Sequence, residues 1–153
     1  MSKVEIGDIL EIPTAKGLAY AQYTHQHRMF GGLIRVFDSI FDSRPDDLSK
    51  LANGPVRFST FLPVKVAVQR DIFKVAGHQE VMLQNKVFPL FRDGVADSKT
   101  KKVAIWWLWD GEKEWSIGSL TPEQRQLPIR QTLNDTMLVK LIEDGWTPAN
   151  DSE

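Results

Sequence analysis

The 153-residue sequence contains no cysteine. Disulfide bonds, cysteine nucleophiles, iron–sulfur clusters and thiolate zinc sites are therefore excluded. Histidine is also scarce, with three in the whole chain, so few side chains are available for general-base or metal chemistry.

An excess of charge of either sign is missing as well. Nineteen basic residues oppose 20 acidic ones, and the formal net charge is −1. Nucleic-acid-binding proteins usually carry a basic excess that neutralises phosphates. The charge balance therefore disfavours nucleic acid as a partner.

Long apolar runs are absent too. No stretch approaches the roughly 20 apolar residues of a membrane-spanning helix, and the first residues lack the apolar core of a signal peptide. We therefore expect a cytoplasmic protein with no membrane partner. Because domains commonly have about 100–150 residues, we expect a single β-rich domain over residues 1–149 and a frayed C-terminal tail over residues 150–153.

Alternation of apolar and polar residues predicts that most of the chain is β-structure. Residues 4–12 and 18–23 alternate on either side of turn residues and predict an antiparallel hairpin. Residues 103–109, followed by Asp110-Gly111 as a two-residue turn and by residues 112–117, predict a second hairpin. Further strands are expected at residues 33–37, 64–68 and 72–76, and residues 87–91 form a short apolar run. Loops are expected at residues 24–29 and 38–51, with one helical turn over residues 46–51.

One helix is expected near the C-terminus, over residues 135–144. Asn134 or Asp135 can cap its start, and Gly145 stands where a terminating glycine belongs. The resulting fold class is mainly β (a β-rich α+β fold). We expect a partly open antiparallel barrel or bent sheet, with the C-terminal helix packed across one opening.

No catalytic constellation is visible in the sequence. No serine lies in a glycine-flanked elbow, and no glycine-rich loop leads into a lysine and a helix. The neighbouring carboxylates Asp46-Asp47 and Glu112/Glu114 fit the start of a short helix and the end of a hairpin. We therefore expect no catalytic residue, no cofactor and no enzyme activity.

A metal site is considered at His25 and His27, which would share a face if they lay on a strand. A third ligand would have to be His78 or a carboxylate. The polar stretch around the pair favours exposed loop histidines, so we expect no metal ligands, although the sequence alone leaves the His25/His27 pair open.

Five tryptophans are present, and alternation places Trp107 and Trp109 on one face of the second hairpin. Trp106 and Leu108 share the other face. Burial of both faces is the favoured interpretation, and exposure of one face to a partner is the alternative. We name Trp107 and Trp109 as candidate partner-binding residues.

Residues 38–47 are rich in aspartate. The simplest interpretation is a solvated loop, but complementary charge could direct it toward a basic protein partner. The candidate partner-binding residues in this stretch are Asp38, Asp42, Asp46 and Asp47.

The first hairpin resembles the opening of the immunity protein 26 family. The resemblance lies in Gly7-Asp8, the Ile12-Pro13 that follows, and the Gly17-Leu18-Ala19-Tyr20-Ala21 hairpin. It extends more loosely to residues 73–78. The family is all-β, and its bacterial members are encoded beside polymorphic toxins, often nucleases, which they are thought to neutralise.

The resemblance implies a toxin-neutralising immunity protein that binds a toxin, with a nuclease suspected, in a stoichiometric complex. A small-barrel module that binds single-stranded nucleic acid through exposed aromatic residues is the alternative. An enzyme of unrecognised type that uses His25, His27 or His78 is the third. Oligomeric state is not indicated by the sequence.

Overall fold

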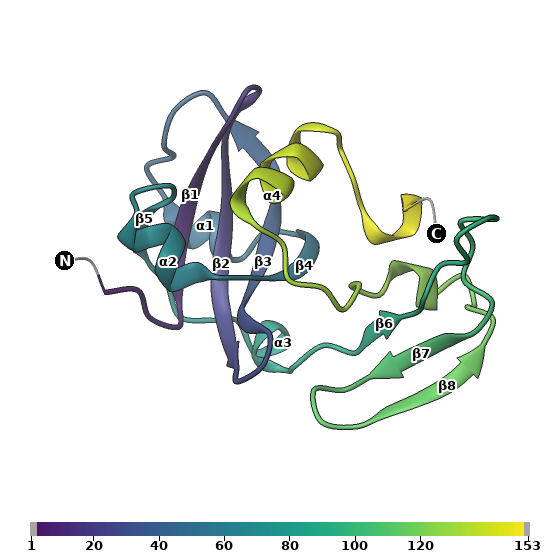
Figure 1. The fold of residues 1–153 in the computed structure, drawn as a ribbon. Coiled ribbons are helices and arrows are strands. Elements are labelled where there is room, and N and C mark those ends of the chain that lie inside the picture. Colours follow the sequence, from purple (N-terminus) through teal and green to yellow (C-terminus); the bar gives the residue numbers. More distant parts are fainter. Residues whose placement is uncertain (1–2, 152–153) are drawn as a thin grey trace. The chain divides into compact units, whose positions relative to one another are not determined.

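The computed structural model describes residues 3–151. The chain is mainly β, as predicted, and its strands form a five-stranded sheet and a three-stranded sheet (Figure 1). Two compact units contain these sheets: Met1–Val87 with Gln131–Gly145, and Phe88–Arg130 with Trp146–Glu153. The single domain expected over residues 1–149 stays a prediction.

In the five-stranded sheet of the first unit, the first four strands form a meander and the fifth returns to pair with the first. Its order is β4-β3-β2-β1-β5, and every pairing is antiparallel. Register shifts in the β2–β3, β3–β4 and β1–β5 pairs bend the sheet without closing it. The strands are β1 (Asp8–Thr14), β2 (Gly17–His27), β3 (Gly31–Phe41), β4 (Val56–Leu62) and β5 (Lys74–His78).

The first predicted hairpin is confirmed as β1 and β2, which close on the pair Thr14 and Gly17. The predicted loop at residues 24–29 is wrong over its first four residues, because β2 continues to His27. That end of β2 pairs with β3, where Gly31 and Gly32 lie opposite His27 and Gln26. Cross-strand pairing therefore overrides the polar composition of this stretch.

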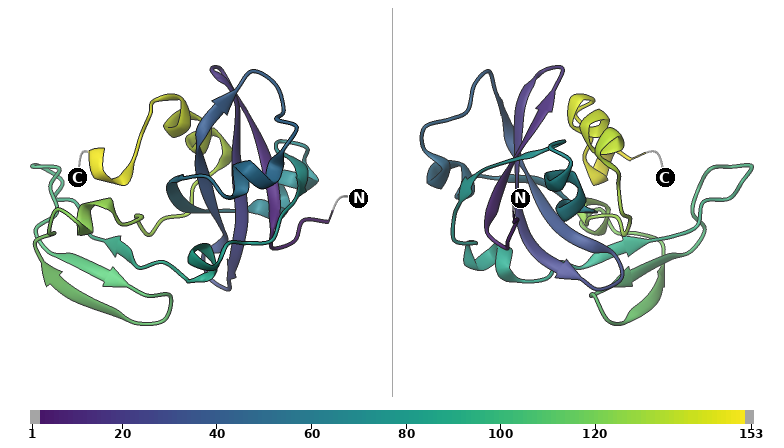
Figure 2. Two further views of the ribbon diagram at one scale, coloured as in Figure 1. Left: turned by 180° about the vertical axis from the view of Figure 1, so that it is seen from behind. Right: turned by 60° about the vertical axis from the view of Figure 1, so that its left-hand side comes forward.

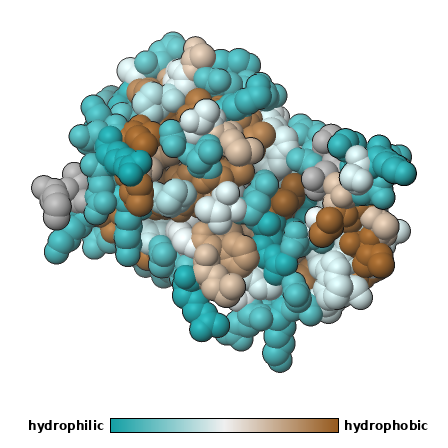
Figure 3. Space-filling view, viewed as in Figure 1, coloured by the Kyte–Doolittle hydropathy of each residue, from teal (hydrophilic) through white to brown (hydrophobic). Residues whose placement is uncertain are grey.

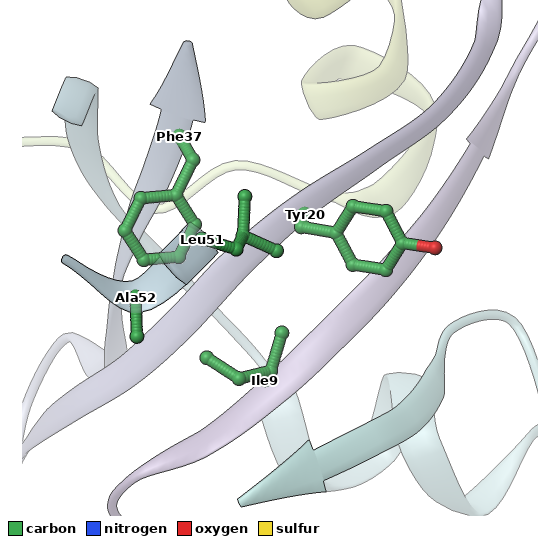
Figure 4. Packing of buried hydrophobic residues seen from close by; sticks show 5 residues of the cluster. All are labelled: Ile9, Tyr20, Phe37, Leu51 and Ala52. Carbon is green, nitrogen blue, oxygen red and sulfur yellow. The ribbon is translucent and has the colours of Figure 1, made fainter. Parts of the chain in front are cut away.

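Helices α1 (Leu48–Ala52) and α4 (Asp135–Glu143) lie on opposite faces of the five-stranded sheet (Figures 1 and 2). On the α1 face, buried side chains from both helix and strands form one cluster (Figure 4). These are Ile9, Tyr20, Phe37, Leu51 and Ala52. Helix α1 and its neighbouring strands therefore share one small core.

The C-terminal helix is confirmed as α4. The Asn134 side chain accepts a hydrogen bond of 2.8 Å from the amide of Met137, and Gly145 follows the helix with φ of +71°. Leu138 and Ile142, one turn apart, are its buried residues. The capping residues and the apolar spacing thus specified this helix locally.

The strand predicted at residues 64–68 is wrong, because this segment is helix α2 (Val64–Gln69). Val64, Ala67 and Val68 are buried while Val66 is exposed, which is the three-and-four spacing of a helix. The three alternating valines fitted a strand equally well in the sequence. A further short helix, α3 (Leu83–Lys86), follows β5.

The second unit contains β6 (Phe91–Asp93), β7 (Trp106–Trp109) and β8 (Glu114–Gly118) in that order. The predicted second hairpin is confirmed as β7 and β8, although β7 begins at Trp106 and not at Val103. Its turn has four residues, because Trp109 pairs with Glu114. Asp110 organises this turn by accepting hydrogen bonds from the amides of Glu112 and Lys113 at 2.9 and 2.8 Å.

Two 3-10 helices complete the second unit, η1 (Gln124–Gln126) and η2 (Pro148–Asn150). Asn150 belongs to a capping box with Thr147, so fraying does not begin at this residue. The rest of the predicted frayed tail lies at the edge of the described chain, and residues 152–153 are outside it. None of the helices within residues 3–151 has the length and apolarity that crossing a membrane requires.

Candidate functional site

The exposed face of β7 carries an apolar surface around Trp107. The side chains of Val95, Ile105 and Trp107 are 90%, 56% and 40% exposed, and we call these three residues the Trp107 patch. They line a shallow pocket of about 430 Å³ together with Asp93, Gly94, Ala104, Glu114 and Arg130. Hydrophobic side chains are visible at the surface of this unit (Figure 3).

Arg130 forms the charged border of the same pocket. Its guanidinium donates to Asp93, with 3.0 Å between Nε and Oδ2, and its Nη2 lies 3.0 Å from Oε2 of Glu114. It also lies over the ring of Trp109, 5.3 Å from the centroid. Ion pairs and a cation–π contact therefore hold Arg130 in place beside the Trp107 patch.

Trp109, the second tryptophan proposed for partner binding, is 5% exposed. Its ring centroid lies 5.6 Å from that of Phe88 and 5.3 Å from that of Phe91. The aromatic contacts assign Trp109 to the core of the second unit. Of the two candidates, Trp107 alone is placed where a partner could contact its ring.

The four candidate aspartates do not lie in one loop. Asp38 is in β3, which extends to Phe41 and not only to residue 37, and Asp47 caps helix α1. The Asp47 side chain accepts hydrogen bonds from the amides of Ser49 and Lys50 at 3.0 and 3.3 Å. The Ser49 hydroxyl and these amides lower the pKa of Asp47. All four aspartates are exposed.

A second pocket, of about 410 Å³, lies among these aspartates in the first unit. Its lining is largely apolar and includes Phe37, Phe41 and Leu51, while Asp38 and Asp47 supply carboxylates. We call it the acidic pocket. The other residues that line it are Ser39, Pro45, Lys50, Gly54 and Pro55.

Arg44, the neighbour in sequence of Pro45 in the acidic pocket, is already paired. Its Nε donates to Oε1 of Glu11 at 2.8 Å, and the Tyr20 hydroxyl donates to the same oxygen at 2.7 Å. The Arg44 hydrogen bond is the main reason that the pKa of Glu11 lies below its usual value. Glu11 offsets Arg44, and among the charged residues that line the pocket Asp38 and Asp47 outnumber Lys50.

The His25 and His27 side chains do not form a common site. Nδ1 of His25 lies 2.9 Å from the Thr24 hydroxyl, and its Nε2 lies 2.8 Å from the carbonyl oxygen of Lys86. Nδ1 of His27 accepts a hydrogen bond from the amide of Met29 at 3.1 Å. Both ring nitrogens of His25 and Nδ1 of His27 thus face separate hydrogen-bond partners.

His78 instead approaches two carboxylates that the sequence did not single out. Its Nδ1 lies 2.8 Å from Oδ1 of Asp8 and 3.8 Å from Oε1 of Glu5. The pairing of β1 with β5 brings Asp8 opposite His78. Nothing in the local sequence gives this register, because the two residues are 70 positions apart.

No protein-family model matches this chain, and neither a curated protein nor a solved structure shows significant similarity to it.

Proposed function

We propose that this protein is a toxin-neutralising immunity protein that acts from the cytoplasm by binding a toxin in a stoichiometric complex. The Trp107 patch is the observation that carries the proposal. A surface of this kind does not need a catalytic residue or a cofactor. Its role is to bind the toxin and to block part of the toxin's surface.

Trp107 has the properties of an interface anchor. Tryptophan is enriched among the residues that dominate binding energy, and such residues lie at the centre of a contact surrounded by others that exclude water. Val95 and Ile105 expose apolar area beside the indole ring. Asp93, Glu114 and Arg130 supply a polar border, as protein interfaces require.

The acidic pocket supports the proposal that the protein partner is basic. Its apolar lining can receive an aliphatic stem, and its aspartates complement a cationic head group. A nuclease binds phosphates and therefore carries the basic surface that such a site would attract. The resemblance of the first hairpin to the immunity protein 26 family implies the same class of partner.

The setting of Trp107 is less favourable to single-stranded nucleic acid, the alternative function. The carboxylates of Asp93 and Glu114 line the same pocket and would repel phosphates. Trp115, the other exposed tryptophan of the hairpin, pairs with Leu108 and projects to the opposite side of the sheet from Trp107. The two rings therefore do not form one stacking platform.

The proposal predicts that a toxin domain is encoded beside the gene of this protein, and it is tested with the purified product of that neighbouring gene. We expect a one-to-one complex by calorimetry and loss of toxin activity. Trp107→Ala should weaken binding by about 2 kcal/mol, which is roughly thirtyfold in Kd. Trp115→Ala is the matched control, because both rings are 40% exposed on the same small sheet.

Equal binding by Trp107→Ala and the unaltered protein would remove the Trp107 patch from the interface. Failure to bind or inhibit the toxin would contradict the immunity function itself. Salt-sensitive binding to an oligonucleotide, lost in Trp107→Ala, would favour the alternative function.

A further inference from the structure

Glu5, Asp8 and His78 bring three ligand atoms together at the junction of β1 and β5. The three atoms all lie within 4.8 Å of one another. Nδ1 of His78 is 2.8 Å from Oδ1 of Asp8 and 3.8 Å from Oε1 of Glu5. Ligands bound tetrahedrally at about 2.0–2.2 Å from a Zn²⁺ ion are separated by roughly 3.4 Å, so small side-chain movements would suffice.

Backbone geometry builds this cluster. Gly7 has φ of +103°, and a Cβ atom at this position would lie 2.5 Å from Cε1 of His78. Only glycine therefore lets the chain before β1 pass so close to the imidazole. The register then sets Asp8 directly opposite His78.

The ligand-bearing segments are also held by hydrogen bonds. Oδ2 of Asp8 accepts from the amide of Glu5 at 2.9 Å, which fixes the carboxylate and leaves Oδ1 toward His78. The buried Gln22 amide donates to the carbonyl oxygens of Gly7 and Gln79 at 3.1 and 2.9 Å. One side chain thus ties the residues next to Asp8 and His78 together.

We propose that Glu5, Asp8 and His78 bind one divalent transition-metal ion of the Zn²⁺ class. One imidazole nitrogen and two carboxylate oxygens form the mixed nitrogen–oxygen set that suits such an ion, whereas Mg²⁺ and Ca²⁺ prefer oxygen alone. Asp8 is buried, while Glu5 and His78 are exposed, so water can complete the coordination from the solvent side. The ion would link β1 to the edge strand β5.

The proposal does not depend on toxin binding, and it revises the expectation of no metal site. The expectation was based on His25 and His27, neither of which belongs to this cluster. The cluster combines residues from the first eight positions with a residue of β5, which only the folded sheet brings together.

Zn²⁺ binding to the tag-free protein, measured by calorimetry, tests the site. We expect one equivalent to bind and the melting temperature to rise. Glu5→Gln and His78→Gln should each weaken binding by at least about tenfold. Glu80→Gln is the matched control, because this exposed carboxylate lines the pocket beside His78 without belonging to the cluster.

Imidazole NMR spectra of the same samples locate the ion. Zn²⁺ should shift the His78 resonances and leave those of His25 in place. Glu5 is at the surface, so Glu5→Gln keeps the test valid if His78→Gln fails to fold. Absence of binding at millimolar Zn²⁺, or binding that Glu5→Gln and His78→Gln leave unchanged, would overturn the proposal.

Discussion

At the scale of single residues, His25 and Arg35 hold the end of helix α3. His25 donates from Nε2 to the carbonyl oxygen of Lys86 at 2.8 Å, and Arg35 donates from Nη2 to that of Val87 at 2.8 Å. The last carbonyls of a helix have no partner within it, so these two side chains satisfy groups that would otherwise be left unpaired. The backbone is thereby fixed where the first unit ends.

This arrangement makes stability depend on pH. Burial lowers the pKa of His25 below its usual value of 6.5; the hydrogen bond to Lys86 opposes this shift in part, and the Arg35 charge adds to it. The unfolded chain therefore binds a proton more readily than the folded one, and stability falls as pH drops below about 6.5. We expect urea unfolding to show this fall, and His25→Gln, which can still donate to Lys86, to reduce it. Equal pH slopes for both proteins would contradict the assignment.

The same residues show what the sequence could not predict. The polar neighbours of His25 favoured an exposed loop histidine, whereas its ring nitrogen is bonded to a backbone group 61 residues away. Likewise, Trp107 and Trp109 are equivalent by alternation, but only Trp109 contacts Phe88 and Phe91. The partners of a side chain are set by tertiary packing, which local spacing does not encode.

At the scale of elements, helix α1 depends on its cap. This five-residue helix is too short to be stable alone, and Asp47 satisfies two of its first amides. We expect Asp47→Ala to lower the free energy of unfolding, measured by chemical denaturation, because two amides at the start of α1 lose their acceptor. Asp46→Ala, at the exposed neighbouring position, should change it by less than about 0.5 kcal/mol. Similar losses in both variants would mean that charge, and not capping, supports the helix.

Elements with local signals were predicted well, and those that depend on distant contacts were not. The β1–β2 hairpin and α4 carry turn and cap residues within their own sequence. Helix α2 does not, and it packs where Gly32 leaves room: a Cβ there would lie 2.6 Å from Cγ2 of Val64. This packing against a glycine 32 positions earlier is a distant contact that the three alternating valines could not reveal.

At the scale of the whole molecule, each unit is assembled from two separate stretches of chain. Residues 131–145 return to the first unit after the whole second sheet has been formed. Composition does not change at residues 87 or 130, so the sequence offered no boundary there. Whether the units unfold together decides between two domains and the single domain over residues 1–149.

Hydrogen exchange followed by mass spectrometry distinguishes these outcomes. Strand β2 is paired along eleven residues and mostly buried, whereas β7 has four residues and β8 is largely exposed. Local opening needs least free energy where few buried contacts are lost. We therefore expect peptides from residues 106–118 to exchange well before those from residues 17–27. Simultaneous exchange of both regions would show that the two sheets form one cooperative domain, since neither could then open without the other.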